Sequence, residues 1–245
     1  MTNRATLEKM EKLKLFGMLR AFNATAGSGV RNDFTPDEFL AHLIDAEWDD
    51  RRNRRLERLV KRAKFRYQAS IEQVDFTHKR NLDKNMFLRF ADCIWLEEKQ
   101  NIIITGATGL GKSFLPSALG HQACLYGYKT LSFNCTKLFP LLGMYKADGS
   151  FQRELSIIAK QDLIILDDFG LVQLDKDSRL ALLEIIEDRI GRESTIITSQ
   201  FPVSKWHEII GDDTIADAIC DRLVHSAHRI ELEGKESLRK YYKKA

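Results

Sequence analysis

One glycine-rich turn constrains the fold of this 245-residue chain more than any other feature. A β-branched run at residues 101–105 leads into Gly106-Ala107-Thr108-Gly109-Leu110-Gly111-Lys112-Ser113, which fits the pattern GxxxxGK followed by Ser or Thr. Glycines allow the backbone to curl so that its N–H groups point at phosphate oxygens, and the start of the following helix favours the same anion. The pattern therefore predicts a phosphate-binding loop between a strand and a helix.

The residue types in this loop suggest separate roles. The lysine is expected to reach the β- and γ-phosphates of ATP, and the serine hydroxyl is expected to bind Mg²⁺. We therefore expect Lys112 to be catalytic as well as ATP-binding, and Ser113 to be a metal ligand. The full set of expected nucleotide ligands is Gly106, Ala107, Thr108, Gly109, Leu110, Gly111, Lys112, Ser113 and Phe114.

Two carboxylates, Asp167 and Asp168, end a second apolar run at residues 163–166. A parallel sheet places the carboxyl ends of its strands at the nucleotide. We expect Asp167 to help hold Mg²⁺ and Asp168 to orient or deprotonate the attacking water. Gln200 follows the next β-branched run, where a polar group would lie between the loop and the acids.

From residue 100 onward, strand and helix patterns alternate. Strands are expected at residues 101–105, 129–133, 162–167, 194–199 and 228–232, and helices near 112–126, 135–146, 150–160 and 176–191. This alternation predicts an α/β fold with a parallel sheet and helices on both faces. The longest apolar runs are far shorter than the ~20 residues of a membrane span, and the first residues are polar, so we expect a cytoplasmic protein without membrane contact.

The first part of the chain is expected to be helical. Apolar residues from Leu7 to Met18 recur at helical spacing, and Thr35-Pro36-Asp37-Glu38 is a strong helix start that leads into residues 49–66. We expect a helical domain at 1–68, a connector at 69–98 and an ATPase domain at 99–245. Residues 1–90 carry 19 Lys/Arg against 13 Asp/Glu, whereas the remainder has a slight acidic excess, so the first part is the better candidate for meeting a polyanion.

Nine basic residues fall within the sixteen positions 51–66. They wrap most of a helix, so a merely solvated surface is one interpretation and contact with nucleic-acid phosphates is the other. We favour backbone contact with double-stranded DNA, largely independent of base sequence. The expected DNA-binding residues are Arg51, Arg52, Arg54, Arg55, Arg58, Lys61 and Arg62.

The motifs together resemble one family. The loop, the Asp-Asp strand with Phe169-Gly170 after it, the run Ile196-Ile197-Thr198-Ser199-Gln200 and the segment Asp221-Arg222-Leu223 closely resemble the IstB-like proteins. Those are AAA+ ATP-binding helpers of IS21-type transposases, related to the helicase loader DnaC. The resemblance covers nearly the whole chain.

The resemblance implies a P-loop AAA+ sheet, a small all-α N-terminal domain and no full C-terminal lid domain. It implies that Asp167 and Asp168 are the Walker B pair, although many AAA+ proteins have Glu at the second position. Gln200 matches the sensor-1 position, and Arg222 matches the arginine finger that completes a neighbouring subunit's site. A sensor-2 role for Arg239 is not expected, and residues 235–244 form a basic tail.

The expected function is an ATPase, slow or stimulated by DNA or a partner, that assembles on DNA with ATP and Mg²⁺ and regulates a cognate transposase. Its expected partners are double-stranded DNA, the transposase and further copies of itself. A DnaC-like helicase loader has the same chemistry and a different client. A P-loop kinase for a small metabolite and a DNA-binding structural protein with a decayed ATP site are the remaining interpretations.

Overall fold

The computed structural model describes residues 3–27, 34–225, 227–234 and 237–238. Arg239 and most of the basic tail lie outside these residues. The chain divides into two compact units, Met1–Arg58 and Leu59–Ala245. The domain boundaries expected at residues 68 and 98 stay predictions.

The smaller unit consists of helices. They are α1 (Asn3–Lys12), α2 (Phe16–Gly27) and the first part of α3 (Pro36–Ala63). The helical stretch expected around residues 7–18 is in fact broken between α1 and α2, where Lys14 adopts a left-handed φ of 58°. The start signal at Thr35 is real, because Glu38 accepts hydrogen bonds from the backbone N–H and hydroxyl of Thr35, both at 2.8 Å.

Glu47 links α2 to α3 inside this unit. Its buried carboxylate accepts hydrogen bonds from the backbone N–H groups of Gly17 at 2.8 Å and Met18 at 3.3 Å, and from Arg51 Nε at 2.6 Å. The helices approach so closely that a Cβ at Gly17 would collide with the carbonyl oxygen of Ala46. Burial alone would raise the pKa of Glu47, but the hydrogen bonds that it accepts outweigh burial and leave its pKa lowered.

Replacing Glu47 with alanine is expected to destabilise the helical unit by about 2–3 kcal/mol, because it leaves two backbone donors and a guanidinium without their acceptor. Since the pKa of Glu47 is lowered in the folded state, its stabilisation is present at neutral pH. It is lost as the pH falls below the unfolded value of about 4.3 and through the folded value. Denaturant unfolding followed by circular dichroism measures both effects. Glu57→Ala, at an exposed position of α3, is the control, and equal losses in the two variants would contradict the assignment.

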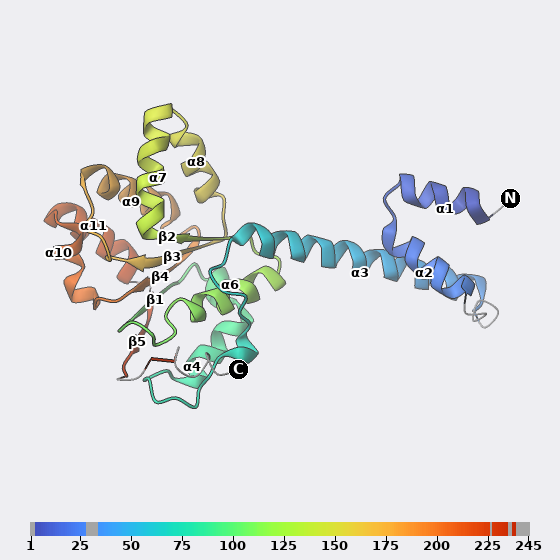
Figure 1. Ribbon diagram of the computed structural model, residues 1–245, viewed down its shortest axis with the longest axis horizontal. Coiled ribbons are helices and arrows are strands. Elements are labelled where there is room, and N and C mark those ends of the chain that lie inside the picture. The colour runs from blue at the N-terminus through green and yellow to red at the C-terminus, as the bar shows by residue number, and fades with distance from the viewer. Residues whose placement is uncertain (1–2, 28–33, 226, 235–236, 239–245) are drawn as a thin grey trace. The chain divides into compact units, whose positions relative to one another are not determined.

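The larger unit is built on one parallel sheet (Figure 1). Its strands are β1 (Asn101–Gly106), β2 (Thr130–Asn134), β3 (Leu163–Phe169), β4 (Ser194–Ser199) and β5 (Ala227–Leu232). They lie in the order β2-β3-β4-β1-β5, and every neighbouring pair is parallel. The α/β expectation is confirmed, and all five strands begin and end within two residues of the expected positions.

Helices cover both faces of the sheet (Figure 1). Side chains alternate along β3, so that Ile164 and Leu166 join one hydrophobic cluster while Leu163 and Ile165 join the other. The first cluster includes residues of α7 (Cys135–Asp148), α8 (Phe151–Ala159), α9 (Lys176–Arg189), α10 (Trp206–Ile210) and α11 (Asp213–Val224). The second includes residues of η2 (Ile71–Gln73), α4 (Lys84–Arg89), η3 (Phe90–Asp92), α5 (Ile94–Glu97) and α6 (Phe114–Leu125).

The segment expected to be a connector, residues 69–98, takes part in the core of the larger unit. Phe87, Phe90 and Trp95 are almost completely buried in the second cluster. Periodicity did not indicate these elements, because α4 and α5 are too short to display a helical repeat. Among the described residues, no helix combines the length and the apolar character needed to cross a membrane.

Candidate nucleotide-binding site

The glycine-rich loop joins β1 to α6 at the carboxyl edge of the sheet. Gly106 and Gly111 have φ angles of 143° and 88°, a region that side chains rarely adopt. A Cβ at Gly106 would also meet the backbone of Leu232 in β5. These two glycines are therefore required by the path of the loop, which turns sharply before α6 begins.

Two segments far along the chain hold the loop in place. The buried guanidinium of Arg80 donates to the carbonyl oxygens of Leu110 and Asp75, both at 2.7 Å. The backbone N–H of Leu238 donates to the carbonyl of Gly109 at 2.9 Å. Arg80 thus ties the segment before β1 to the loop, a structural contact that no sequence motif indicated.

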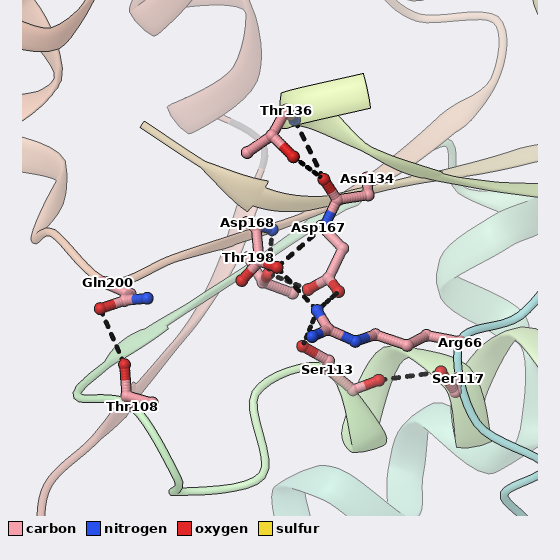
Figure 2. A network of polar contacts seen from close by, with 10 residues as sticks. All are labelled: Arg66, Thr108, Ser113, Ser117, Asn134, Thr136, Asp167, Asp168, Thr198 and Gln200. Atoms are coloured by element: carbon pink, nitrogen blue, oxygen red, sulfur yellow. Dashed lines mark hydrogen bonds and ion pairs between the residues drawn. The ribbon is translucent and has the colours of Figure 1, made fainter. Parts of the chain in front are cut away.

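Lys112 and Ser113 lie where the loop becomes helix. Lys112 is buried, and its Nζ donates to the carbonyl oxygen of Ala107 within the loop at 2.8 Å. Ser113 precedes the first residue of α6, and its hydroxyl faces the acidic pair (Figure 2). The Ser113 side chain therefore points to the side of the loop on which β3 ends, and the Lys112 side chain bonds within the loop.

The acidic pair ends β3 with an unusual backbone. The pairing of β3 with β4 shifts register between Leu166 and Phe169, and Asp168 has a left-handed φ of 60°. Successive side chains of a regular strand point to opposite faces, whereas this irregularity brings both Asp167 and Asp168 to one side. Asp tolerates this conformation better than most residues, and such strain is common at functional sites.

Neighbouring strands orient both acids. The hydroxyl of Thr198, completely buried in β4, donates to Asp167 Oδ1 at 2.5 Å and accepts from the backbone N–H of Asp168 at 3.0 Å. The side-chain amide of Asn134, at the end of β2, donates to Asp168 Oδ2 at 2.9 Å (Figure 2). Asp168 Oδ2 therefore already has a hydrogen-bond donor in Asn134.

A guanidinium lies among these oxygens. Arg66 Nη1 is 2.6 Å from Asp168 Oδ2, 3.0 Å from Asp167 Oδ2 and 3.4 Å from Ser113 Oγ (Figure 2). The hydrogen bond to Asp167, ahead of the bond to Asp168, raises the pKa of Arg66 despite some desolvation. A hydroxyl and a carboxylate are hard oxygen donors of the kind that Mg²⁺ prefers, and here they already surround a cation. The donor set of Ser113 and Asp167 therefore fits Mg²⁺.

A cleft of about 430 Å³ opens beside the loop. Its walls include the loop, Asp168, Gln200, Arg66 and Tyr67. The volume is within the range of small-molecule sites. The Tyr67 and Phe114 rings lie 6.2 Å apart in its wall, so the cleft offers apolar surface as well as charge.

The family model for the IstB-like ATP binding protein matches residues 8–245. The chain belongs to this family. It is 45% identical over 235 residues to an insertion sequence ATP-binding protein of Sinorhizobium fredii, covering 96% of each chain. It is 30% identical over 228 residues to the IS5376 ATP-binding protein of Geobacillus stearothermophilus, covering 93% of this chain and 91% of the relative.

Solved structures show the same fold in more distant proteins. The DnaC helicase loader superposes with a TM-score of 0.56 at 20% identity, over 70% of this chain and all of that one. DnaA from Aquifex aeolicus bound to AMPPCP gives a TM-score of 0.58 at 17% identity, over 74% of this chain and 55% of that one. The AAA+ fold expected for an IstB-like protein is thereby confirmed.

Gln200 belongs to the site of this IstB-like protein, on the side of the loop. Its Oε1 accepts a hydrogen bond from the Thr108 hydroxyl at 2.9 Å. β4 lies between β3 and β1, so the polar end of this strand does fall between the acids and the loop, as expected. Within β4, however, the residue that bonds to the acids is Thr198, one residue before the end of the strand.

Arg222 lies at the opposite edge of the sheet. It is on α11, next to Asn101 at the start of β1, whereas the loop follows the end of β1. Six strand residues span about 16 Å, so Arg222 does not serve the site of its own chain. Its guanidinium bonds to Glu187 at 3.1 Å and to the carbonyl of Ala218 at 2.8 Å, and its side chain is 29% exposed.

The basic residues of α3 divide into two groups. Arg51 pairs with Glu47 and Arg54 pairs with Asp50, both at 2.6 Å. The remaining expected DNA contacts are all exposed: Arg52, Arg55, Arg58, Lys61 and Arg62. The two paired arginines have a structural contact within the helical unit, although Arg51 is itself exposed, and the other five have exposed side chains without a salt bridge to an acid among the described residues.

Sequence reasoning missed four residues of the site: Arg66, Arg80, Asn134 and Thr198. Asn134 and Thr198 carried a usable signal, because each is a polar residue at the carboxyl end of a strand, as Asp167 is. Arg66 was hidden among the nine basic residues of the expected helix. That helix ends at Ala63, three residues before Arg66.

Proposed function

We propose that the protein is an ATPase that binds double-stranded DNA, assembles with other copies of itself when ATP is bound, and regulates an IS21-type transposase. The observation that carries the proposal is the meeting of the glycine-rich loop, Ser113 and Asp168 at one cleft, in an IstB-like protein whose relatives are named insertion sequence ATP-binding proteins. Hydrolysis would remodel or disassemble the complex.

Each residue of the site has a chemical role in this proposal. The loop N–H groups and Lys112 hold the phosphates, and Ser113 and Asp167 hold Mg²⁺, which when bound offsets phosphate charge. Asp168 orients the attacking water and accepts its proton. The bond from Asn134 occupies one oxygen of Asp168, which supports a slow basal rate that rises when this bond is released.

Assembly would put ATP between subunits. Arg222 is remote from its own loop, which supports a role at the ATP site of a neighbouring copy. Sedimentation with DNA and either ATP or ADP tests this part of the proposal. We expect large complexes with ATP and DNA and small species with ADP, and a monomer under both conditions would exclude it.

The exposed basic residues of α3 support phosphate contact. If all five remaining side chains contact phosphates, the logarithm of the binding constant should fall with the logarithm of salt concentration with a slope of about −4 to −5. Removing two of them, as in the double variant Arg52→Ala with Arg55→Ala, should reduce the magnitude of this slope by about 2. It should also lower the affinity for all DNA sequences by a similar factor. Fluorescence anisotropy of labelled duplexes over a salt series measures both. An unchanged slope would mean that these basic side chains of α3 are solvated and do not contact phosphates.

A DnaC-like helicase loader is the second candidate, and the shared fold supports it. The relatives that cover this chain at 30–45% identity are named for insertion sequences, which favours the transposase as the client. Pull-down of purified transposase and of purified replicative helicase decides between them, because each hypothesis expects retention of one partner only.

A further inference from the structure

The nucleotide site contains a cation supplied by the chain itself. One nitrogen of Arg66 contacts oxygens of three residues from two elements: Ser113 at the end of the loop, and both acids of β3 (Figure 2). Ser113 and Asp167 are the residues to which Mg²⁺ binding is ascribed. An ion bound to them at its usual distance of about 2.0–2.1 Å would need the space and the oxygen lone pairs that Arg66 uses.

Packing on both sides presents Arg66 to the acids. The Phe65 ring lies so close to α6 that a Cβ at Gly120 would collide with it. On the other side, the Tyr67 ring lies 5.9 Å from the Arg66 guanidinium and contacts Phe114 at the start of α6. The three consecutive side chains thus all reach the loop, the helix after it or the acids.

This segment also ends the basic helix. α3 terminates at Ala63, which is fully buried, and Lys64 turns the chain with a left-handed φ of 55°. Only Lys64 and Phe65 separate the last helical residue from Arg66. A rearrangement of the backbone at Arg66 would therefore occur within three residues of the end of α3.

The contact between Arg66 and the acids is only partly shielded from solvent. The side chain of Arg66 is 41% exposed, so solvent screens its attraction to the acids. Mg²⁺ carries twice the charge of Arg66 and arrives with a triphosphate that Lys112 and the loop bind at the same time. A metal–nucleotide complex that bound to Ser113 and Asp167 would therefore compete with Arg66 for the same oxygens.

We propose that Arg66 is a built-in counter-ion of the acidic pair that must leave when Mg²⁺ and ATP bind. Binding at the site would then loosen residues 64–67, the segment that directly follows α3. This inference rests on the proposed ATP-binding function. It goes beyond that function by naming the residue that senses the metal and the segment that responds.

The first test is the Mg²⁺ requirement of nucleotide binding. In the full chain, a fluorescent ATP analogue is titrated at a series of Mg²⁺ concentrations. Arg66→Gln is expected to lower the half-saturating Mg²⁺ concentration about three- to tenfold, the size expected from losing two partly exposed ion pairs. The control Lys64→Asn removes one charge two residues away with a residue that tolerates positive φ, and is expected to stay within about twofold of the unchanged protein.

The outcomes separate this inference from the proposed function. Mg²⁺-dependent binding by the unchanged protein, with the same requirement in Arg66→Gln, would overturn the role of Arg66 and leave the ATP site standing. A lack of nucleotide binding in the unchanged protein would overturn the proposed function and the inference with it. A lowered requirement in both variants would show an effect of general charge and would overturn the specific role.

The second test needs no variant. Hydrogen exchange of the peptide that contains residues 64–67 is measured without ligand, with the ATP analogue in EDTA, and with the analogue and Mg²⁺. Exchange is expected to become faster only in the last condition. Exchange that is unchanged or slower with Mg²⁺ and analogue would overturn the proposal even if Arg66→Gln did not fold.

Discussion

Replacing Lys112 with alanine is expected to weaken ATP binding by about 100-fold or more and to abolish ATP-dependent assembly on DNA. Lys112 is buried at the start of α6 and in the described structure donates to the loop itself, through the carbonyl of Ala107. In the complex that we propose, the ammonium group of Lys112 donates to the β- and γ-phosphates instead. Hydrogen bonds to charged groups are each worth about 1.5–3 kcal/mol.

The measurement combines equilibrium binding of an ATP analogue with sedimentation of the protein on duplex DNA. Lys137→Ala, at an exposed position of α7, removes the same charge elsewhere and should behave as the unchanged protein. Thermal unfolding of both variants separates lost binding from lost folding. Unaltered assembly by Lys112→Ala would instead favour a DNA-binding structural protein whose ATP site has decayed.

The arrangement of the loop and the acids was predictable to the extent that it depends on short sequence patterns. The loop needs glycines at fixed spacing, and the β-branched runs before Gly106 and Asp167 predicted strands because a buried parallel strand is continuously apolar. The order of these strands then brings the loop and the acids to one edge. These inferences required no knowledge of contacts between distant residues.

The other features depend on such contacts. Arg66 lies 101 positions before Asp167 in the sequence, and nothing in a run of basic residues distinguishes the one that turns inward. The left-handed backbone of Asp168 is equally invisible, because Asp is common in regular strand ends and in irregular ones. The sequence did not predict α10 and α11, because Gly211, with a φ of 72°, divides their apolar residues into two short groups.

The position of Arg222 leads to the second large effect. Arg222→Ala is expected to reduce ATP turnover at least about 10³-fold while ATP binding stays nearly unchanged, because an arginine that completes a phosphoryl-transfer site acts mainly on the transition state. The matched control is Arg153→Ala, at an exposed position of α8. Steady-state phosphate release at saturating ATP and DNA measures the rate. Equal rates for the two variants would make Arg222 an ordinary surface residue bonded to Glu187.

Mixing two inactive variants tests whether Arg222 acts across a subunit boundary. Asp168→Asn keeps a residue that tolerates a left-handed φ and loses the carboxylate that accepts the proton, so its own site is inactive while its Arg222 is intact. Arg222→Ala has an intact loop and acidic pair but offers no arginine to its neighbour. In a mixed assembly, an Asp168→Asn copy can complete the site of an Arg222→Ala copy. Turnover should therefore exceed the sum of the separate variants. A rate equal to that sum would mean that Arg222 does not act at the ATP site of a neighbouring copy.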